Sequence, residues 1–338
     1  MIRDWGDLDA RARGLSSRLL DRAALLALAR AAGLPALRAA LPAGLRPAER
    51  AEDPTPIDLE RAARAHAARQ LALLSRWADR RRHVLAVIFE EEDLRSARAL
   101  VRGAAGSLPP ARRLAGLLPT TSTPEPALAD AAEAPTPQAA LERLAAWGRP
   151  DAEAAARAAG GIAHDLFHVE SLLARGFARR IEKAARRGGR ALRAAAAQAV
   201  DLENAWTALF AHGFASDVSA ADLFLDGGGA LDRERYLRAA GAQDPTDRRR
   251  IVAGAFAGGP LAEPFGDLAT PWTKLERAVL RARIDEQRRA RHLDPLGPAP
   301  LLEFALRLRG QLRDLQTVVW GVTLDASPDV VATELVAS

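Results

Sequence analysis

The stretches DLRSARALVRG (93–103), DLENAWTALFAHG (201–213) and QLRDLQTVVWG (311–321) decide the fold of this chain. They begin 108 and 110 residues apart (201 − 93 and 311 − 201). Positions +1, +4 and +8 of each stretch are apolar, which places them on one stripe of a helix. The stripe residues are Leu94, Ala97, Val101, Leu202, Ala205, Leu209, Leu312, Leu315 and Val319. The stretches are therefore predicted to be three copies of one amphipathic motif helix.

Two flanks accompany the stripe in every copy. Positions 0 and +3 share one side of the predicted helix, and positions +5 and +9 share the other. We predict that these flanks contact partner proteins. The predicted contact residues are Asp93, Ser96, Arg98, Arg102, Asp201, Asn204, Trp206, Gln311, Asp314, Gln316 and Trp320. For Trp206 and Trp320, core packing is the alternative to a role as contact anchors.

The repeat extends beyond the motif helices. A longer helix is predicted before each of them, over 57–82, 163–187 and 271–291, with an acid in its first turn that suits the helix dipole. These acids include Glu60, Glu170 and Glu276. An apolar pair follows each motif start by 24 or 25 residues, as Leu117 and Leu118, Phe224 and Leu225, and Leu335 and Val336. The predicted repeats are 1–150, 151–255 and 256–338.

Composition favours an all-α fold. Ala, Leu, Arg and Glu dominate, and aromatic residues make up 5% of the chain. The 48 basic and 43 acidic residues give a net charge of only +5, and they are interspersed rather than gathered in one stripe. There is no cysteine, so the chain offers no disulfide and no thiolate metal site. No stretch approaches the eighteen apolar residues of a membrane span, so we expect the chain not to cross a membrane.

The order and spacing of the motifs resemble those of the C-type stalk protein of bacterial and archaeal vacuolar-type rotary ATPases, whose eukaryotic counterpart is the d-type protein of the vacuolar ATPase. That family carries an acid-x-x-Asn-Leu-basic helix three times at about this spacing. The stretches 11–41 and 294–316 also look like the family's opening helices and its approach to the third motif. Three departures stand out: Ser96 and Ala97 replace Asn-Leu, Trp206 replaces a basic residue, and Gln311 and Asp314 replace Glu and Asn.

The resemblance implies a funnel of three pseudo-threefold-related helical lobes without catalysis or cofactors. It implies partners at both ends, namely the central shaft subunits of the D and F type and the membrane ring of proteolipid c-type subunits. The chain would then be a peripheral protein on the cytoplasmic face of the membrane, transmitting torque for proton or sodium ion transport. The motif flanks are expected to face the shaft. Arg-rich helix ends are expected to meet the acids of the ring and phospholipid headgroups.

Two patterns that could carry chemistry are weak. His164 and His168 have the spacing of zinc ligands on a helix, but Asp165 stands where a metalloprotease has Glu, and no third ligand follows. The glycines at 227–229 lack the Lys-Ser/Thr of a phosphate-binding loop, which makes a turn the better interpretation. We therefore predict no catalytic residue, no metal site and no nucleotide site.

Two other classes of protein remain open on the sequence. An α-helical repeat scaffold would share the repeats and a concave face, although its usual period of about 33 to 47 residues is less than half of the period here. An Arg-rich nucleic-acid-binding protein would bind with a steep salt dependence. The connector interpretation predicts no nucleic-acid partner.

Overall fold

The computed structural model describes residues 5–47, 53–160, 166–186, 188–210, 219–294 and 296–337. These residues form eighteen α-helices and two short 3-10 helices, with no strand among them, so the all-α prediction is confirmed. The chain divides into two compact units. Unit 1 comprises 1–79, 114–125 and 284–338, and unit 2 comprises 80–113 and 126–283. The division into repeats 1–150, 151–255 and 256–338 stays a prediction.

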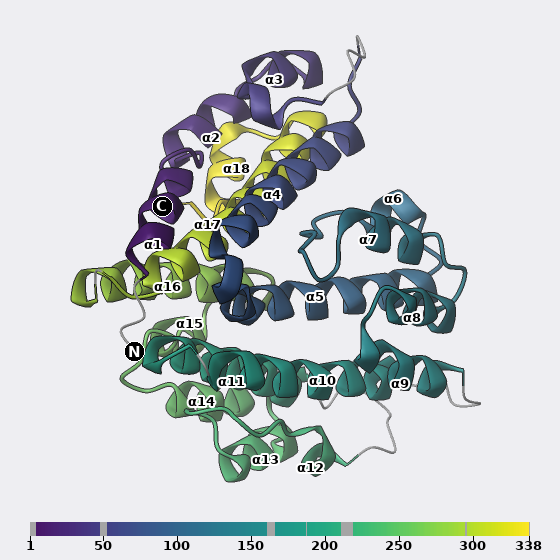
Figure 1. Cartoon of the computed structure of the whole chain (residues 1–338), viewed down its shortest axis with the longest axis vertical. Helices are drawn as coiled ribbons and strands as arrows, with labels where there is room; N and C mark the ends of the chain where they lie inside the picture. Colours follow the sequence, from purple (N-terminus) through teal and green to yellow (C-terminus); the bar gives the residue numbers. More distant parts are fainter. Residues whose placement is uncertain are drawn as a thin grey trace. The chain divides into compact units, whose positions relative to one another are not determined.

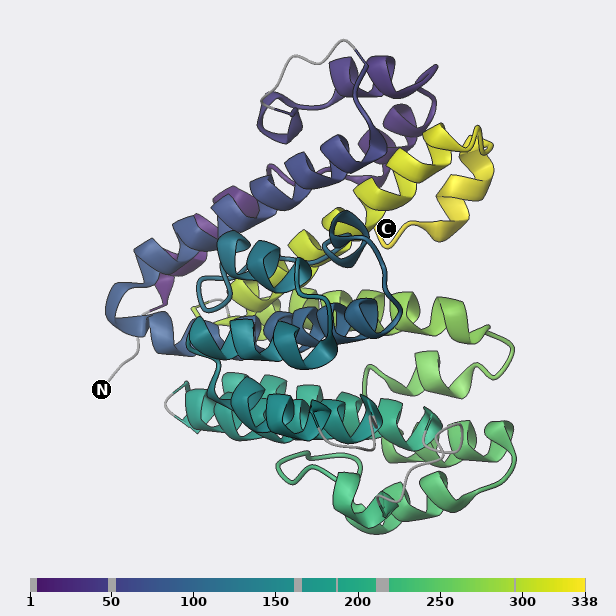
Figure 2. The same ribbon diagram turned by 90° about the vertical axis from the view of Figure 1, so that its right-hand side faces the viewer.

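Unit 1 is assembled around the last long helix, α17, which packs against α1, α2, α3, α4 and α18. Helices α4 and α17 run beside each other in Figure 1 and also in Figure 2, where the view is turned by 90°. Segments from the two ends of the chain therefore share one core. Its elements are α1 (Gly6–Ser16), α2 (Arg22–Ala29), α3 (Leu34–Ala40), η1 (Ala43–Leu45), α4 (Pro56–Ala78), α17 (Ala299–Thr323) and α18 (Pro328–Glu334).

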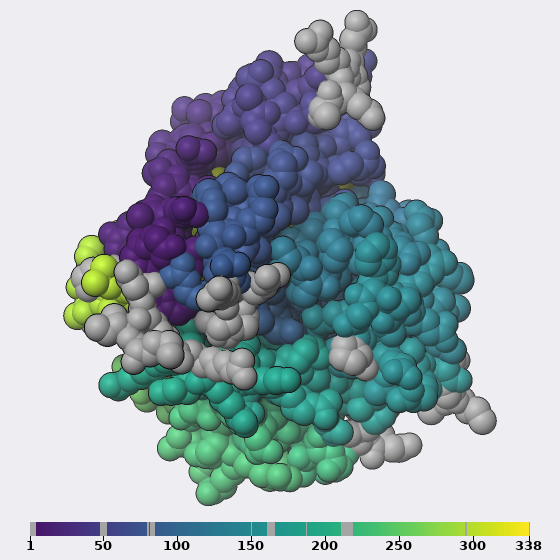
Figure 3. All heavy atoms as spheres, in the orientation of Figure 1, coloured from purple at the N-terminus to yellow at the C-terminus, as the bar shows by residue number. Residues whose placement is uncertain are grey.

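Unit 2 contains the remaining helices, except that η2, α7 and α16 each cross a unit boundary. Helix α5 packs on α10 and α8, and α11 packs on α10, α13 and α14. In the space-filling view, the atoms coloured blue to teal, which include α6 to α9, are closely packed (Figure 3). The elements are η2 (Asp79–Arg81), α5 (Arg82–Ala105), α6 (Pro110–Arg113), α7 (Glu125–Ala132), α8 (Pro137–Ala146), α9 (Pro150–Ala159), α10 (Leu166–Arg186), α11 (Arg190–Phe210), α12 (Ala220–Leu223), α13 (Arg233–Gly241), α14 (Pro245–Ala255), α15 (Ala262–Gly266) and α16 (Trp272–Leu293).

Local sequence explains where many helices begin. Helix α4 opens with a capping box in which Thr55 accepts from the Asp58 N–H and Asp58 accepts from the Thr55 N–H, with Pro56 at the first helical position. Asp21, Thr136, Asp232 and Ser327 each cap their helices by accepting from a backbone N–H of the first turn. These caps satisfy backbone donors that have no partner within the helix. Short polar sequence signals therefore mark the starts of these five helices.

The predicted motif stripe is confirmed, since all nine of its residues are buried. The long helices are also confirmed within a few residues, as α4, α10 and α16. The motif helices, however, are not short. Each motif begins eleven or twelve residues inside a helix of 21 to 25 residues, namely α5, α11 and α17. The residues before each motif contain no proline beyond the first helical turn, so the helix continues through them into the motif.

The composition of the segment 119–137, which is rich in Pro and Ala, predicts a loop, but the segment contains helix α7. Proline is compatible with the first turn of a helix, where its missing N–H has no partner to lose, and Pro126 is the second residue of α7. Four residues of α7 are buried, and the buried Arg113 donates to the carbonyls of Ala132, at its last turn, and Ala134, just beyond it. Much of this segment therefore belongs to the packed structure.

Candidate interaction site

The polar residue at position +3 of the second motif holds the backbone of its own chain. The Nδ2 of Asn204 donates to the Leu225 carbonyl at 2.8 Å, and its Oδ1 accepts from the Leu225 N–H at 2.9 Å. Asn204 is fully buried, and Leu225 belongs to the apolar pair found after the motif in sequence. One amide side chain thus satisfies both backbone groups of a buried residue 21 positions away.

The third motif uses the same position in the same way. The Asp314 carboxylate accepts from the N–H of Val336 at 2.6 Å and from that of Ala337 at 2.9 Å. At position 0 of this motif, Gln311 accepts from the Leu20 N–H at 2.7 Å. The third motif therefore fastens segments near both ends of the chain to α17.

At position 0 of the second motif, Asp201 fastens the glycine run. Its two carboxylate oxygens accept from the N–H groups of Gly229, Ala230 and Leu231 at 2.8 to 3.0 Å. A Cβ at Gly228 would lie only 2.2 Å from Asp201 Oδ1, so the approach requires glycine. The N–H groups that a phosphate would need are used by this carboxylate, and the prediction of a turn at 227–229 agrees with this arrangement.

The first motif places its position 0 residue in a buried network of charges. Arg149 donates to Asp93 at 2.7 Å and to Glu90 at 3.3 Å, and Arg180 bonds Glu90 and Asp151 at 2.8 Å. Burial raises the pKa of Glu90, although Arg149 and Arg180 act in the opposite direction. The network thus joins α5, α9 and α10 through charges that can be kept inside only because they are paired.

Six predicted contact residues are therefore turned toward their own chain. The set at positions 0 and +3 is at most 6% exposed: Asp93, Ser96, Asp201, Asn204, Gln311 and Asp314. Of these six, all but Ser96 form the hydrogen bonds or ion pairs described above. Sequence patterning placed them correctly on a helix edge, but their visible role is to anchor segments of this chain. A contact between these residues and a partner stays a prediction.

Position +9 makes a second kind of contact, with the long helix of another copy. In the third copy, the Trp320 Nε1 donates to the Glu60 carboxylate in α4 at 2.6 Å. In the first, Arg102 forms two hydrogen bonds with Glu170 in α10, at 2.6 and 2.5 Å, which raise the pKa of Arg102. In the second, the ring of Phe210 lies 5.5 Å from that of Trp272, the first residue of α16.

These three contacts follow one rule in sequence order. The +9 residue of the first copy contacts the long helix of the second copy. In the same way, the +9 residue of the second copy contacts the long helix of the third, and the +9 residue of the third contacts the long helix of the first. Glu60 and Glu170 are the fifth residues of their helices, and Glu276 has the same place in α16. From the sequence alone, these acids are expected only to suit the helix dipoles. Their matching offset from the motifs was the signal that could have revealed Glu60 and Glu170 as the partners of position +9.

The position +5 residues have mixed surroundings. Arg98 pairs with Glu203 at 2.5 Å, and Trp206 lies 5.6 Å from the ring of the buried Phe265. The Gln316 side chain lies over Gly116, where an added Cβ would come within 3.0 Å of its Oε1. These side chains are only partly buried, and at position +9 the side chain of Arg102 is 62% exposed. Positions +5 and +9 thus keep surface that a partner can reach.

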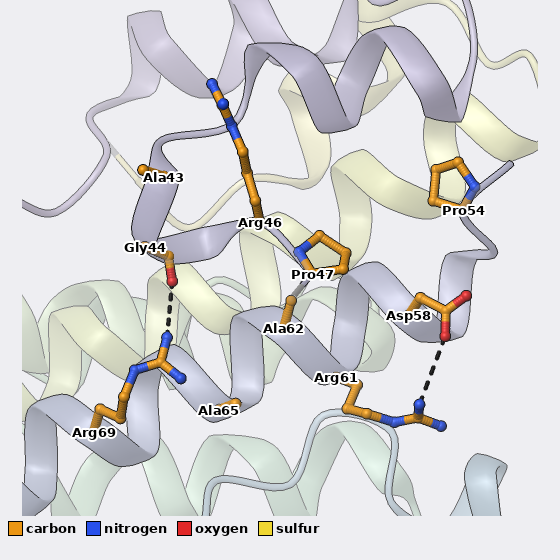
Figure 4. A pocket seen from close by; sticks show the side chains of 10 residues that line it. All are labelled: Ala43, Gly44, Arg46, Pro47, Pro54, Asp58, Arg61, Ala62, Ala65 and Arg69. Carbon is orange, nitrogen blue, oxygen red and sulfur yellow. Dashed lines mark hydrogen bonds and ion pairs between the residues drawn. The ribbon is translucent and has the colours of Figure 1, made fainter. Parts of the chain in front are cut away.

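One hollow of about 450 Å³ lies in unit 1 between η1 and the start of α4 (Figure 4). Arg69 reaches the Gly44 carbonyl at 2.9 Å and Arg61 reaches Asp58 at 3.6 Å, as the dashed lines show. Arg46 donates to two backbone carbonyls, those of Ala39 and Leu41. All three arginines of this hollow therefore bond backbone carbonyls or a carboxylate of their own chain.

Neither metal ligands nor a membrane span is evident in the part of the chain that the structure describes. No three His, Cys, Asp or Glu side chains of that part are placed to hold a metal ion. His164 lies outside the described residues, so its pairing with His168 is not placed. None of the described helices has the length and apolar character needed to cross a bilayer.

Fold and contacts together define an all-α protein whose motif helices anchor their own chain on one flank and meet the long helices on the other. Comparison with protein families gives a match to the ATP synthase (C/AC39) subunit family over residues 8–333. The chain belongs to this family, and its place is therefore within a V-type ATP synthase, a membrane complex. A comparison with curated proteins gives no match.

Proposed function

We propose that this chain is the connector of the central stalk, joining the rotor shaft to the membrane ring of proteolipid subunits. In this function it carries torque between nucleotide chemistry and ion transport and catalyses nothing itself. The family match over 8–333 supports a place within the complex. The cyclic rule of position +9 supports three similar lobes about one axis, which suits a part that must seat a shaft on a ring.

The cyclic contacts are the observation on which the proposal depends most. Motif helices in a linear array contact neighbours only, and the last copy has no reason to meet the first. Here Trp320 of the third motif bonds Glu60 of the first long helix at 2.6 Å. A contact of the last copy with the first favours closure about an axis over an open α-helical scaffold.

We infer that the shaft contacts the partly exposed residues at positions +5 and +9. Five of the six residues at these positions, all except Phe210, are the proposed contacts: Arg98, Arg102, Trp206, Gln316 and Trp320. Arginine and tryptophan are enriched in the energetic centres of protein interfaces, which supports this choice. The six buried anchors would act indirectly, by fixing the segments around these positions.

The test is a binding experiment with purified components. The chain is mixed separately with D-type and F-type shaft subunits and with the detergent-solubilised proteolipid ring, and complexes are separated by size. We expect binding to both, and Arg102→Glu should weaken shaft binding at least roughly tenfold, as expected for a charged contact residue. Arg157→Glu is the matched control, because Arg157 is an exposed arginine of α9 paired with the exposed Glu153. Binding to neither component would overturn the proposal.

A further inference from the structure

The turn between α10 and α11 carries an exposed cluster of bases, called here the basic turn. It consists of Arg179, Lys183 and Arg186 on α10 and Arg190 and Arg193 on α11, all exposed. The spacing of the first three, by four and then three residues, places them along one face of α10. The two helices pack against each other, so the five charges gather at one end of a helical hairpin.

The basic turn is poorly neutralised within the chain. Arg186 pairs with Glu182 at 2.8 Å, and both side chains are more than half exposed. Among the described residues, the side chains of the other four bases form no hydrogen bond or ion pair. Five bases against one acid leave an excess charge of about +4. Elsewhere, exposed arginines such as Arg157 and Arg250 have an acid three or four residues away.

Two of these bases stand where they oppose the helix dipole. Arg190 is the first residue of α11, Arg193 follows within its first turn, and that turn contains no acid. Cations are unfavourable at the positive end of a helix. The residue before Arg190 is Gly189, with φ of 88°, which has no side chain to cap the helix. Helix stability therefore does not explain these two arginines, whereas a negatively charged surface beside the turn would offset their repulsion.

We propose that the basic turn contacts the anionic lipid headgroups of the membrane on which the complex stands. Clusters of four to eight Lys and Arg bind anionic leaflets in this manner. The sequence 179–193 has no aromatic side chain on which nucleic-acid bases could stack. The five bases also surround no large apolar side chain that is exposed among the described residues, whereas protein interfaces bury such a centre. The choice of a membrane as the anionic surface rests on the proposed function.

The test uses the purified full chain and protein-free vesicles in a flotation assay. One set of vesicles is phosphatidylcholine alone, and the other contains roughly a third phosphatidylglycerol, at about 0.1 M salt where screening is moderate. The test variant combines Lys183→Gln, Arg186→Gln, Arg190→Gln and Arg193→Gln. The matched control combines Arg18→Gln, Arg30→Gln, Arg235→Gln and Arg238→Gln, which removes four exposed bases elsewhere. Circular dichroism verifies that both variants keep their helices.

We expect the wild-type chain and the control to float with the anionic vesicles only. The partition coefficient of the test variant should fall roughly 600-fold, since each of the four bases near an anionic surface contributes about fivefold. Equal binding by test and control variants would overturn the proposal, as would no binding of the wild-type chain. Tighter binding of the wild-type chain to duplex DNA than to the vesicles at the same salt would also overturn it. These vesicles contain no rotary protein, so failure here is distinct from failure to bind shaft and ring.

Discussion

The indole Nε1 of Trp320 donates a 2.6 Å hydrogen bond to the carboxylate of Glu60, which joins the last motif helix to the first long helix. Arg102 and Glu170 have the same relationship one copy later in the cycle. Glu60 is only 9% exposed, and a buried carboxylate without a hydrogen-bond donor is unfavourable, so the donor from the neighbouring motif stabilises the fold. In these two copies, position +9 is a side chain that can donate to the acid it meets.

Replacing Trp320 with Phe should therefore destabilise unit 1. The aromatic ring is kept, but the donor is lost and the Glu60 carboxylate loses a short hydrogen bond. We expect the free energy of unfolding to fall by about 1 to 3 kcal/mol. Urea titration followed by far-ultraviolet circular dichroism measures the change.

The control for this substitution is Trp147→Phe. Trp147 is 44% exposed, and its Nε1 bonds an exposed Asp130 at 3.2 Å. This loss should stay within about 0.5 kcal/mol, as for ordinary surface changes. If both variants lose the same free energy of unfolding, the hydrogen bond to Glu60 contributes no more to stability than an exposed one.

Periodicity predicted much of the fold, because burial of one helix face repeats every 3.6 residues and leaves its mark in sequence. All nine stripe residues are buried, and α4, α10 and α16 begin within a few residues of their predicted starts. Composition does not predict helix α7, because a high density of proline favours a loop. Pro126 instead occupies the first turn, the one part of a helix that accepts it.

A periodic pattern could not predict what the polar residues at positions 0 and +3 contact. A polar residue at a helix edge can face solvent, a partner or a distant segment of its own chain, and the three look alike in sequence. Asn204 and Asp314 bond backbone groups 21 to 23 residues further on, beyond the reach of any local rule. The apolar pair at that distance was visible, but the pattern gave no reason to connect it with the flank.

Asn204→Leu tests the anchoring role of position +3. The substitution keeps the volume but leaves the N–H and the carbonyl of Leu225 buried without their partner. Two unsatisfied groups should cost about 3 kcal/mol in total. Hydrogen exchange should show faster exchange at the Leu225 amide, while a solvent-exposed surface role for Asn204 would leave that amide unchanged. Thr207→Val, at a partly exposed site of the same helix, is the control and should change stability by less than about 0.5 kcal/mol.

Arg149→Leu should be among the most damaging substitutions in unit 2. It removes the ion pairs of Arg149 with Asp93, Glu90 and Asp151. These three acids are at most 9% exposed. Breaking a buried ion pair from one side costs about 3 to 5 kcal/mol. The deficit should shrink at acidic pH, because burial raises the pKa of Glu90 and a neutral Glu90 no longer needs the arginine, and a constant deficit from about pH 7 to about pH 4 would contradict this account. Arg157→Leu, which breaks an exposed pair, should cost at most about 1 kcal/mol.

Glu92 should make stability depend on pH near neutrality. Burial raises the pKa of Glu92 from 4.5 to about 7, with Glu91 and Asp93 adding to the effect and Arg95 opposing it. Between these two values the folded chain holds a proton that the unfolded chain has lost, so stability should fall as pH rises from about 4.5 through about 7. Glu92→Gln lacks this proton, and its stability relative to the wild-type chain should increase over that interval by on the order of 3 kcal/mol. Urea titrations of both proteins at several pH values measure the difference, with Glu153→Gln as the exposed control that should show none. A difference that stays constant with pH would mean that Glu92 remains ionised in the fold.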